Sequence, residues 1–89
     1  MKPIKFDQNF INKLQKLKKQ NAPLYSKIHK QLSLFKENLE HPSLRTHQLK
    51  GKLKNVFSIS INKSFRLVYI KNGEYLFFDL GFHSQIYKN

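Results

Sequence analysis

The sequence predicts an α+β fold in which an N-terminal αα-hairpin packs on a small antiparallel β-sheet. Three observations lead to this expectation. Apolar residues recur every three or four positions as far as residue 39, they alternate with polar residues from residue 56 onward, and all 3 glycines lie in the second half. The first spacing gathers side chains on one face of a helix, and the second gathers them on one face of a strand. A chain of 89 residues is expected to form a single domain over residues 1–89.

Two helices are expected in the first half. Asp7 is a suitable N-cap for the first helix. The apolar positions of that helix are Phe10, Leu14 and Leu17. The segment 21–23 (Asn-Ala-Pro) interrupts the pattern and can begin a second helix, because asparagine caps helices and proline is tolerated in the first turn. His41-Pro42 is expected to end the second helix, since the residue before a proline disfavours helical geometry.

The second half predicts strands. Val56–Ile61, Phe65–Ile70 and Glu74–Leu80 are expected to form an antiparallel meander, and Pro3–Phe6 is a candidate edge strand. Asn72-Gly73 is the strongest hairpin signal and predicts a two-residue type I′ turn. The expected order is therefore β-α-α-β-β-β, with the helices segregated from the sheet.

Arg66 is the most informative single residue, because it lies in the middle of an apolar strand. An arginine cannot be left unpaired in a core. A two-residue turn at 72–73 would place Asp79 directly across from Arg66, so one interpretation is a cross-strand ion pair. The other is an open sheet face that presents the guanidinium to a phosphate, which its planar fork suits.

The charge is strongly positive. The 17 Lys and Arg against 5 Asp and Glu give a formal net charge of +12, which favours a nucleic acid or an acidic protein as partner. Residues 44–54 contain four of these cations and His47 without one acid. Such a run is either a solvated loop or a grip on a phosphate backbone.

Several classes of function are disfavoured. The chain has no cysteine, which removes disulfides, thiolate nucleophiles and cysteine-based zinc sites, and no histidine pair has metal-ligand spacing. We therefore expect no metal and no cofactor. No apolar run approaches the ~20 residues of a membrane span, and no secretory signal is evident. A cytoplasmic protein without a membrane partner is expected.

Several segments together resemble a known family. They are His41-Pro42-Ser43-Leu44, His47-Gln48-Leu49-Lys50-Gly51, Phe65-Arg66-Leu67-Val68-Tyr69 and Gly81-Phe82-His83-Ser84-Gln85-Ile86-Tyr87. Their order and spacing resemble the RelE/ParE superfamily of bacterial toxins, in particular the mRNA-interferase branch with YafQ- and YoeB-like proteins. The resemblance implies the toxin of a type II toxin-antitoxin system. Such a toxin is an endoribonuclease that cuts mRNA in the A site of the 30S ribosomal subunit, and an acidic cognate antitoxin holds it inactive and alone mediates contact with operator DNA.

The resemblance also implies roles for individual residues. His47 matches the expected general base, Arg66 the arginine that contacts the scissile phosphate, and His83 the general acid. Tyr87 matches a terminal aromatic that stacks on a base or supports the acid. The basic residues that we expect to bind the RNA backbone are Arg45, Lys50, Lys52, Lys54 and Lys63. The reaction is metal-independent attack of the 2′-hydroxyl on the adjacent phosphate, with acid-base catalysis.

Two other functions remain open. A ParE-like inhibitor of DNA gyrase would act through a protein surface and would not need the two histidines. A basic RNA-binding module without catalysis would show salt-dependent binding and no new RNA ends.

Overall fold

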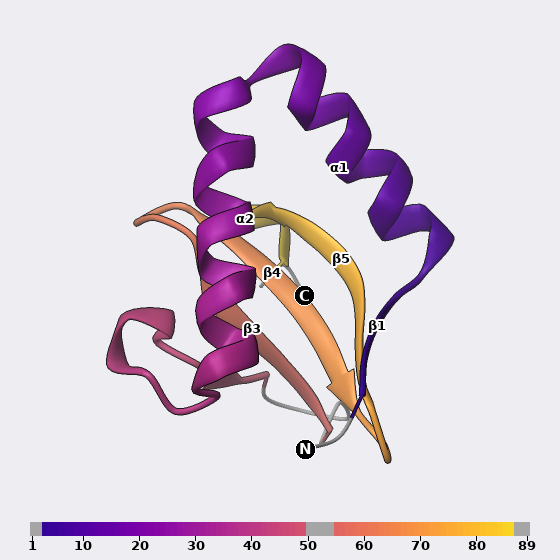
Figure 1. The fold of residues 1–89 in the computed structure, drawn as a ribbon, viewed down its shortest axis with the longest axis vertical. Helices are drawn as coiled ribbons and strands as arrows, with labels where there is room; N and C mark the ends of the chain where they lie inside the picture. The colour runs from indigo at the N-terminus through magenta and orange to yellow at the C-terminus, as the bar shows by residue number, and fades with distance from the viewer. Residues whose placement is uncertain (1–2, 50–54, 87–89) are drawn as a thin grey trace.

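The computed structural model describes residues 3–49 and 55–86, in which two helices cover one face of a β-sheet (Figure 1). The elements are β1 (Ile4–Phe6), α1 (Gln8–Gln20), α2 (Ala22–Glu37), the short 3-10 helix η1 (Pro42–Leu44), β2 (His47–Gln48), β3 (Val56–Ser60), β4 (Phe65–Lys71), β5 (Tyr75–Phe82) and α3 (His83–Ile86). The α+β class and the expected order of its main elements are confirmed. The structure adds β2, η1 and α3, which are too short to give a periodic signal.

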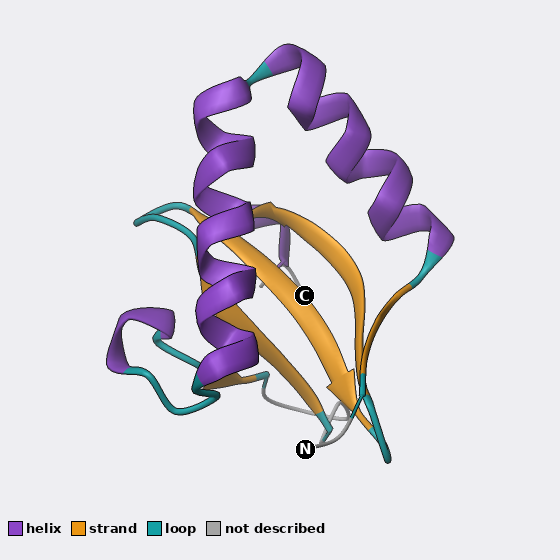
Figure 2. Ribbon diagram, in the orientation of Figure 1, coloured by secondary structure: helices purple, strands orange, loops and turns teal. Residues whose placement is uncertain are grey.

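The sheet has five strands in the order β1-β5-β4-β3-β2 (Figure 2). The strands from β2 to β5 pair antiparallel, as expected, whereas β1 pairs parallel to β5. The sheet is therefore mixed. A parallel partner is possible because the two helices intervene between β1 and the rest of the sheet, which gives the chain the length to cross over.

Side-chain caps begin both long helices. Asp7 Oδ1 accepts a hydrogen bond from the Phe10 backbone N–H at 2.8 Å, and Asn21 Oδ1 accepts one from the Leu24 N–H at 3.2 Å. Each bond satisfies an amide that the first turn of a helix leaves without an intrahelical partner. The caps expected at Asp7 and Asn21 are confirmed.

The second helix ends earlier than expected. α2 stops at Glu37 with Asn38 as C-cap, so the predicted end at His41-Pro42 is wrong. Asn38 turns the chain, because its Oδ1 accepts from the Glu40 N–H at 3.1 Å. Pro42 instead begins η1, where His41 Nδ1 accepts from the Ser43 N–H at 3.1 Å. The asparagine side chain thus competes with the helix before the proline is reached.

The core lies between the helices and one face of the sheet. At its centre, contacting aromatic rings have centroids between 5.1 and 5.8 Å apart. These rings belong to Phe10, Phe35, Tyr69, Tyr75 and Phe77. Burial, together with the neighbouring Tyr75, raises the pKa of Tyr69 to about 12, so this core phenol is uncharged at neutral pH.

The turn between β4 and β5 is longer than expected. Lys71 pairs with Tyr75, which leaves residues 72–74 as a three-residue connection. Of these three, only Gly73 has a positive φ, of 72°. A type I′ turn needs two consecutive residues with positive φ, so the predicted two-residue turn is wrong.

A register shift next to Val68 offsets β4 and β5 by one further residue. Arg66 consequently pairs with Gly81, and Asp79 pairs with Val68. Asp79 forms its ion pair with Lys13 of α1, at 2.7 Å. The interpretation of Arg66 and Asp79 as a cross-strand pair is therefore wrong, because the longer turn and the shift together displace the expected register.

Candidate functional site

Arg66 is held on β4 by three hydrogen bonds to neutral oxygens. Its Nε donates to Ser58 Oγ at 2.7 Å, and its Nη2 donates to the carbonyl oxygens of Arg45 at 2.6 Å and Ser58 at 3.3 Å. Ser58 is fully buried on β3, whereas Arg66 is half-buried. Because no acceptor carries a charge, the guanidinium keeps its full positive charge while its plane is fixed.

One edge of the Arg66 guanidinium remains available for a ligand. Within the described ranges, no hydrogen bond or ion pair engages Nη1. An arginine presents five N–H donors in a planar fork, so the two donors of Nη1 can still bind the oxygens of an anion. Arg66 therefore follows neither of the two expected arrangements in full: its partners are neutral oxygens, and it remains partly exposed.

The segment before β2 supplies one of the oxygens that bind Arg66. Arg45 ends η1 in a left-handed conformation, with φ 45° and ψ 50°, and its N–H donates to the Pro42 carbonyl. Left-handed geometry is unfavourable for a residue with a side chain and is found where the surrounding structure imposes it. Here it accompanies the 2.6 Å bond from Arg66 to the Arg45 carbonyl.

His47 lies beside the same serine. It pairs with Ser58 across β2 and β3. Directly paired residues of neighbouring strands point to the same face of a sheet. Arg66 pairs with Ser60, two residues beyond Ser58 and so on that face too. The structure therefore brings the exposed His47 and the half-buried Arg66 together around Ser58.

His83 lies on the other side of Arg66, just beyond the end of β5. Gly81 pairs with Arg66, and the His83 N–H, two residues later, donates to the Ser64 carbonyl at 2.6 Å. Lys63 and His83 line one shallow hollow of about 420 Å³ together with Ser64, Phe82 and Ser84. Neither His47 nor Arg66 lines this hollow. The three expected catalytic residues thus follow one another across the sheet, His47 on β2, Arg66 on β4 and His83 after β5.

Four of the expected residues lie outside the part of the chain that the structure describes. They are Lys50, Lys52, Lys54 and Tyr87. Arg45 and Lys63 are described and exposed. In the described ranges, no group of three or more His, Cys, Asp or Glu side chains could hold a metal ion. The helices described here are also too short or too polar to cross a membrane.

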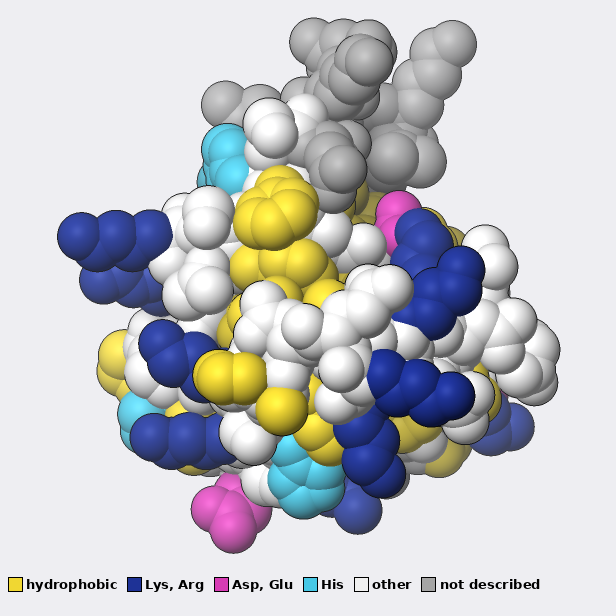
Figure 3. Space-filling view, turned by 90° about the horizontal axis from the view of Figure 1, so that it is seen from above, with side chains coloured by type: hydrophobic (Ala, Val, Ile, Leu, Met, Phe, Trp, Pro, Cys, Tyr) yellow, Lys and Arg dark blue, Asp and Glu magenta, His cyan; other side chains and the backbone are white. Residues whose placement is uncertain are grey.

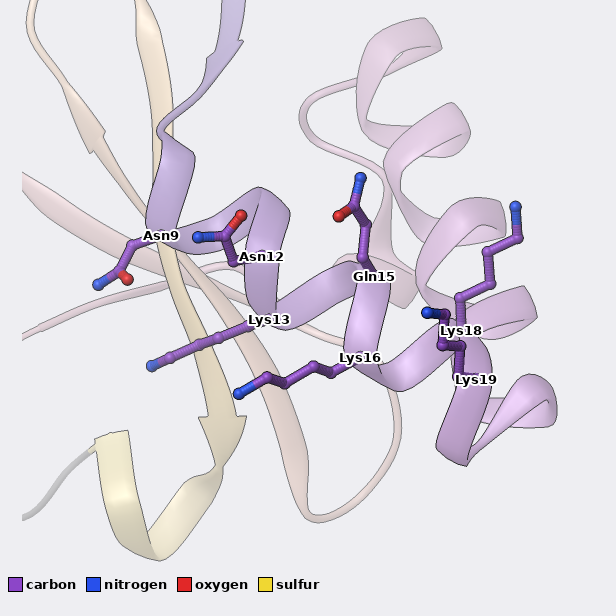
Figure 4. Close-up of a pocket in the computed structure, with 7 residues that line it drawn as sticks. All are labelled: Asn9, Asn12, Lys13, Gln15, Lys16, Lys18 and Lys19. Atoms are coloured by element: carbon purple, nitrogen blue, oxygen red, sulfur yellow. The ribbon is translucent and has the colours of Figure 1, made fainter.

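The outer face of α1 is a second basic surface, which the sequence analysis did not single out. A hollow of about 780 Å³ is lined by polar residues of this one helix (Figure 4). They are Asn9, Asn12, Lys13, Gln15, Lys16, Lys18 and Lys19. Asn9, Lys13 and Lys16 extend to the same side of α1 in Figure 4. The lysines at positions 13, 16 and 19 could have indicated this surface from the sequence, because residues three apart are neighbours on a helix surface.

Basic side chains exceed acidic ones in the view of Figure 3. Lys and Arg gather on both sides of a strip of hydrophobic and uncharged surface, and few acids are visible. The two ion pairs given by the described residues, Lys5 with Glu74 and Lys13 with Asp79, are both at least partly exposed. Most of the positive charge therefore remains available to an anionic partner.

The arrangement of two helices on this five-stranded sheet is a fold that is also found among solved structures of small toxins. No protein-family model matches the chain, and no curated protein matches its sequence. Solved structures of YoeB, YafQ and ParE toxins do match its fold, so the expected resemblance is confirmed at the level of the fold.

Three of these structures illustrate the similarity. The YoeB/ParE toxin from Agrobacterium tumefaciens is 18% identical over 91% of this chain and 98% of its own, with a TM-score of 0.75. The YoeB-YefM complex from Staphylococcus aureus is 23% identical over 93% and 98%, with a TM-score of 0.73. The E. coli DinJ-YafQ complex is 16% identical over 98% and 99%, with a TM-score of 0.79. At these identities the likeness establishes the fold alone.

Proposed function

We propose that this protein is the toxin of a type II toxin-antitoxin system and that it is an endoribonuclease that cleaves mRNA on the ribosome. The observation that carries the proposal is the Arg66 guanidinium, fixed by neutral oxygens with Nη1 available and with a histidine on either side of it along the sheet. A fixed, uncompensated cation is what the developing charge on a phosphate requires.

The reaction needs three groups around the phosphate. The 2′-oxygen forms a bond to phosphorus as the bond from phosphorus to the 5′-oxygen breaks, which leaves a 2′,3′-cyclic phosphate and a 5′-hydroxyl. A base takes the proton from the 2′-hydroxyl, and an acid gives a proton to the departing 5′-oxygen. In an in-line displacement the attacking 2′-oxygen and the departing 5′-oxygen lie on opposite sides of the phosphorus. The base and the acid must therefore lie on opposite sides of the phosphate, and so on either side of the residue that binds it.

The strand order supports assigning these two roles to His47 and His83. His47 on β2 is assigned the role of base, Arg66 on β4 binds the phosphate, and His83 after β5 is assigned the role of acid. An RNA strand that crosses from β2 to β5 would meet these residues in that sequence. Tyr87 is assigned to stack on a base or support the acid, and the backbone contacts are assigned to Arg45, Lys50, Lys52, Lys54 and Lys63. None of these assignments requires a metal.

The proposed partners are mRNA on the 30S subunit and an acidic antitoxin. Solved complexes with a matching toxin fold pair YoeB with YefM and YafQ with DinJ. This protein has a net charge of +12, so an acidic antitoxin that covers its surface would bind strongly and keep RNA away. We assign any contact with operator DNA to the antitoxin, and we assign the protein to the cytoplasm, where its RNA substrate lies.

The test is to map the 5′ ends of mRNA after induction of the wild-type chain, His83→Ala and Arg66→Ala. We expect new ends within codons for the wild type and at least a roughly 30-fold loss in each variant, the scale of removing about 2 kcal/mol of positioned electrostatic stabilisation. Lys27→Ala on the exposed side of α2 is the control and should cleave like the wild type. Wild-type cleavage that survives in both variants would refute the assignments.

Two other outcomes would point to another function. Inhibition of gyrase supercoiling that survives His83→Ala would identify a gyrase inhibitor. Salt-dependent RNA binding without any new RNA ends would identify a binding module.

A further inference from the structure

Phe82 is a large aromatic residue that the fold leaves half in solvent. Its exposed fraction is 51%, compared with 4% for Phe65, against which it packs. The two ring centroids are 5.4 Å apart and the rings are nearly perpendicular, at 82°. An edge-to-face contact of this kind fixes the plane of the outer ring on a buried support. Phe82 therefore presents an ordered apolar surface at the end of β5.

The surroundings of Phe82 are polar and positively charged. The ring lines the hollow of about 420 Å³ together with Lys63, Ser64, His83 and Ser84. The His83 N–H donates to the Ser64 carbonyl, which ties the end of β5 to the residue before β4, and both residues line this hollow. No acidic side chain lines it. A ligand that fits must offer a flat apolar surface and a negative charge next to each other.

We propose that Phe82 is a stacking platform for a nucleobase of single-stranded RNA, with Lys63 at the neighbouring phosphate. This inference rests on the proposed function and adds a base-binding position beside His83. Nucleotides combine a planar base with an anionic backbone, and single-stranded RNA is commonly bound by bases that stack on aromatic side chains next to cations.

An acidic protein segment is the competing occupant, and the geometry favours RNA. Protein partners are anchored by side chains that enter well-packed, desolvated pockets. Here the hollow is shallow and the aromatic ring belongs to this chain, so it offers a face to a ligand instead of receiving one. Stacking also predicts a preference, because the larger rings of purines cover more of an aromatic face than those of pyrimidines.

The chain contains no tryptophan, so Phe82→Trp introduces a single tryptophan, which can be excited selectively over the 4 tyrosines, as a reporter at the platform. We expect short oligo(A) to quench its emission and to bind several-fold more tightly than oligo(U). Inorganic polyphosphate, which has the charge but no base, should leave the emission unchanged. Phe6→Trp is the matched control, because Phe6 is also exposed, at 40%, but lies on β1 away from this hollow. Its emission should not respond to any of the three.

Phe82→Leu and Phe82→Tyr separate stacking from size. Loss of the aromatic ring in Phe82→Leu should weaken oligo(A) binding by about tenfold, as expected for one lost stacking contact, and Phe82→Tyr should bind like the wild type. Equal responses to polyphosphate and oligo(A), or unchanged binding by Phe82→Leu, would overturn the inference. A response only to the antitoxin would also overturn it and would make Phe82 a protein anchor.

These outcomes are distinguishable from failure of the proposed function. The fluorescence titration measures binding in solution and needs no cleavage. Wild-type cleavage with no response of the Phe82→Trp reporter to RNA would remove the platform and leave the nuclease. A clear response without any cleavage would keep the platform and remove the nuclease.

Discussion

At the scale of single residues, Arg66 lies within an apolar strand and is held in place without an acidic partner. A carboxylate partner would hold Arg66 and also cancel its charge. Ser58 and the Arg45 carbonyl hold it through 2.6–3.3 Å bonds and leave the charge intact. For a group that must stabilise an anion, neutral partners give orientation at no electrostatic cost.

Ser58→Ala tests this arrangement. The variant removes the acceptor of the Arg66 Nε bond, and we expect cleavage to fall by about tenfold, the scale of one hydrogen bond to a charged group of roughly 1.5 kcal/mol. Ser60→Ala is the matched control: Ser60 lies on the same strand and face, but its hydroxyl donates to the Asn62 carbonyl. Mapping of 5′ ends, with thermal unfolding of each variant, is the measurement. Full cleavage by a folded Ser58→Ala variant would contradict the positioning role.

The partners of Arg66 show what the sequence could predict about the site and what it could not. Arginine on an apolar strand was recognisable as a functional candidate from residue type and alternation alone. Its acceptors lie 8 and 21 residues away along the chain, on β3 and after η1. The contact with Ser58 depends on the register of β3 against β4. The contact with the Arg45 carbonyl depends on the pairing of β2 with β3, and His47–Gln48 is too short to show alternation. The roles of His47 and His83 remain predictions.

At the scale of elements, the positions of the strands along the chain were predictable from the sequence, whereas the register between β4 and β5 was not. Val56–Ser60 and Phe65–Lys71 lie where alternation indicated them. The offset depends on the turn at 72–74 and on the register shift next to Val68. Residues 75–78 (Tyr-Leu-Phe-Phe) are apolar or aromatic without a break, so alternation does not show where an extra residue enters β5.

Gly73→Ala tests how strongly the turn constrains the β4–β5 hairpin. Gly73 has φ 72°, and a β-carbon built there meets no atom within 4 Å. Any loss of stability therefore comes from the backbone, and we expect the free energy of unfolding to fall by about 1–2 kcal/mol in urea titrations. Gly73→Asn should lose less, because asparagine tolerates this conformation better than alanine. Equal stability of Gly73→Ala and the wild type would mean that the turn relaxes to another form.

At the scale of the whole molecule, composition predicted an anionic partner but not where it binds. Among the described residues, two hollows are lined by cations: one at the end of the sheet with Lys63, and one on the outer face of α1. Lys13 is bound by Asp79, which leaves Lys16, Lys18 and Lys19 as cations of α1 without an acidic partner in the described ranges, and Lys18 lies over the ring of Tyr25. The ribosomal substrate proposed above would be large enough to contact both regions at once.

Lys16→Gln with Lys19→Gln tests whether α1 contributes to that contact. We expect weaker binding to purified 30S subunits, and a plot of log affinity against log salt less steep by roughly 0.7–0.9 for each lysine lost, because each phosphate contact releases counterions. Lys27→Gln with Lys30→Gln on α2 removes the same charge from exposed positions outside this hollow. It therefore controls for net charge and should keep most of the wild-type slope. The two double variants have equal net charge. Equal slopes would therefore show that α1 acts only through the overall electrostatic field of the molecule. A lower slope in the α1 variant alone would place bound phosphates on this helix.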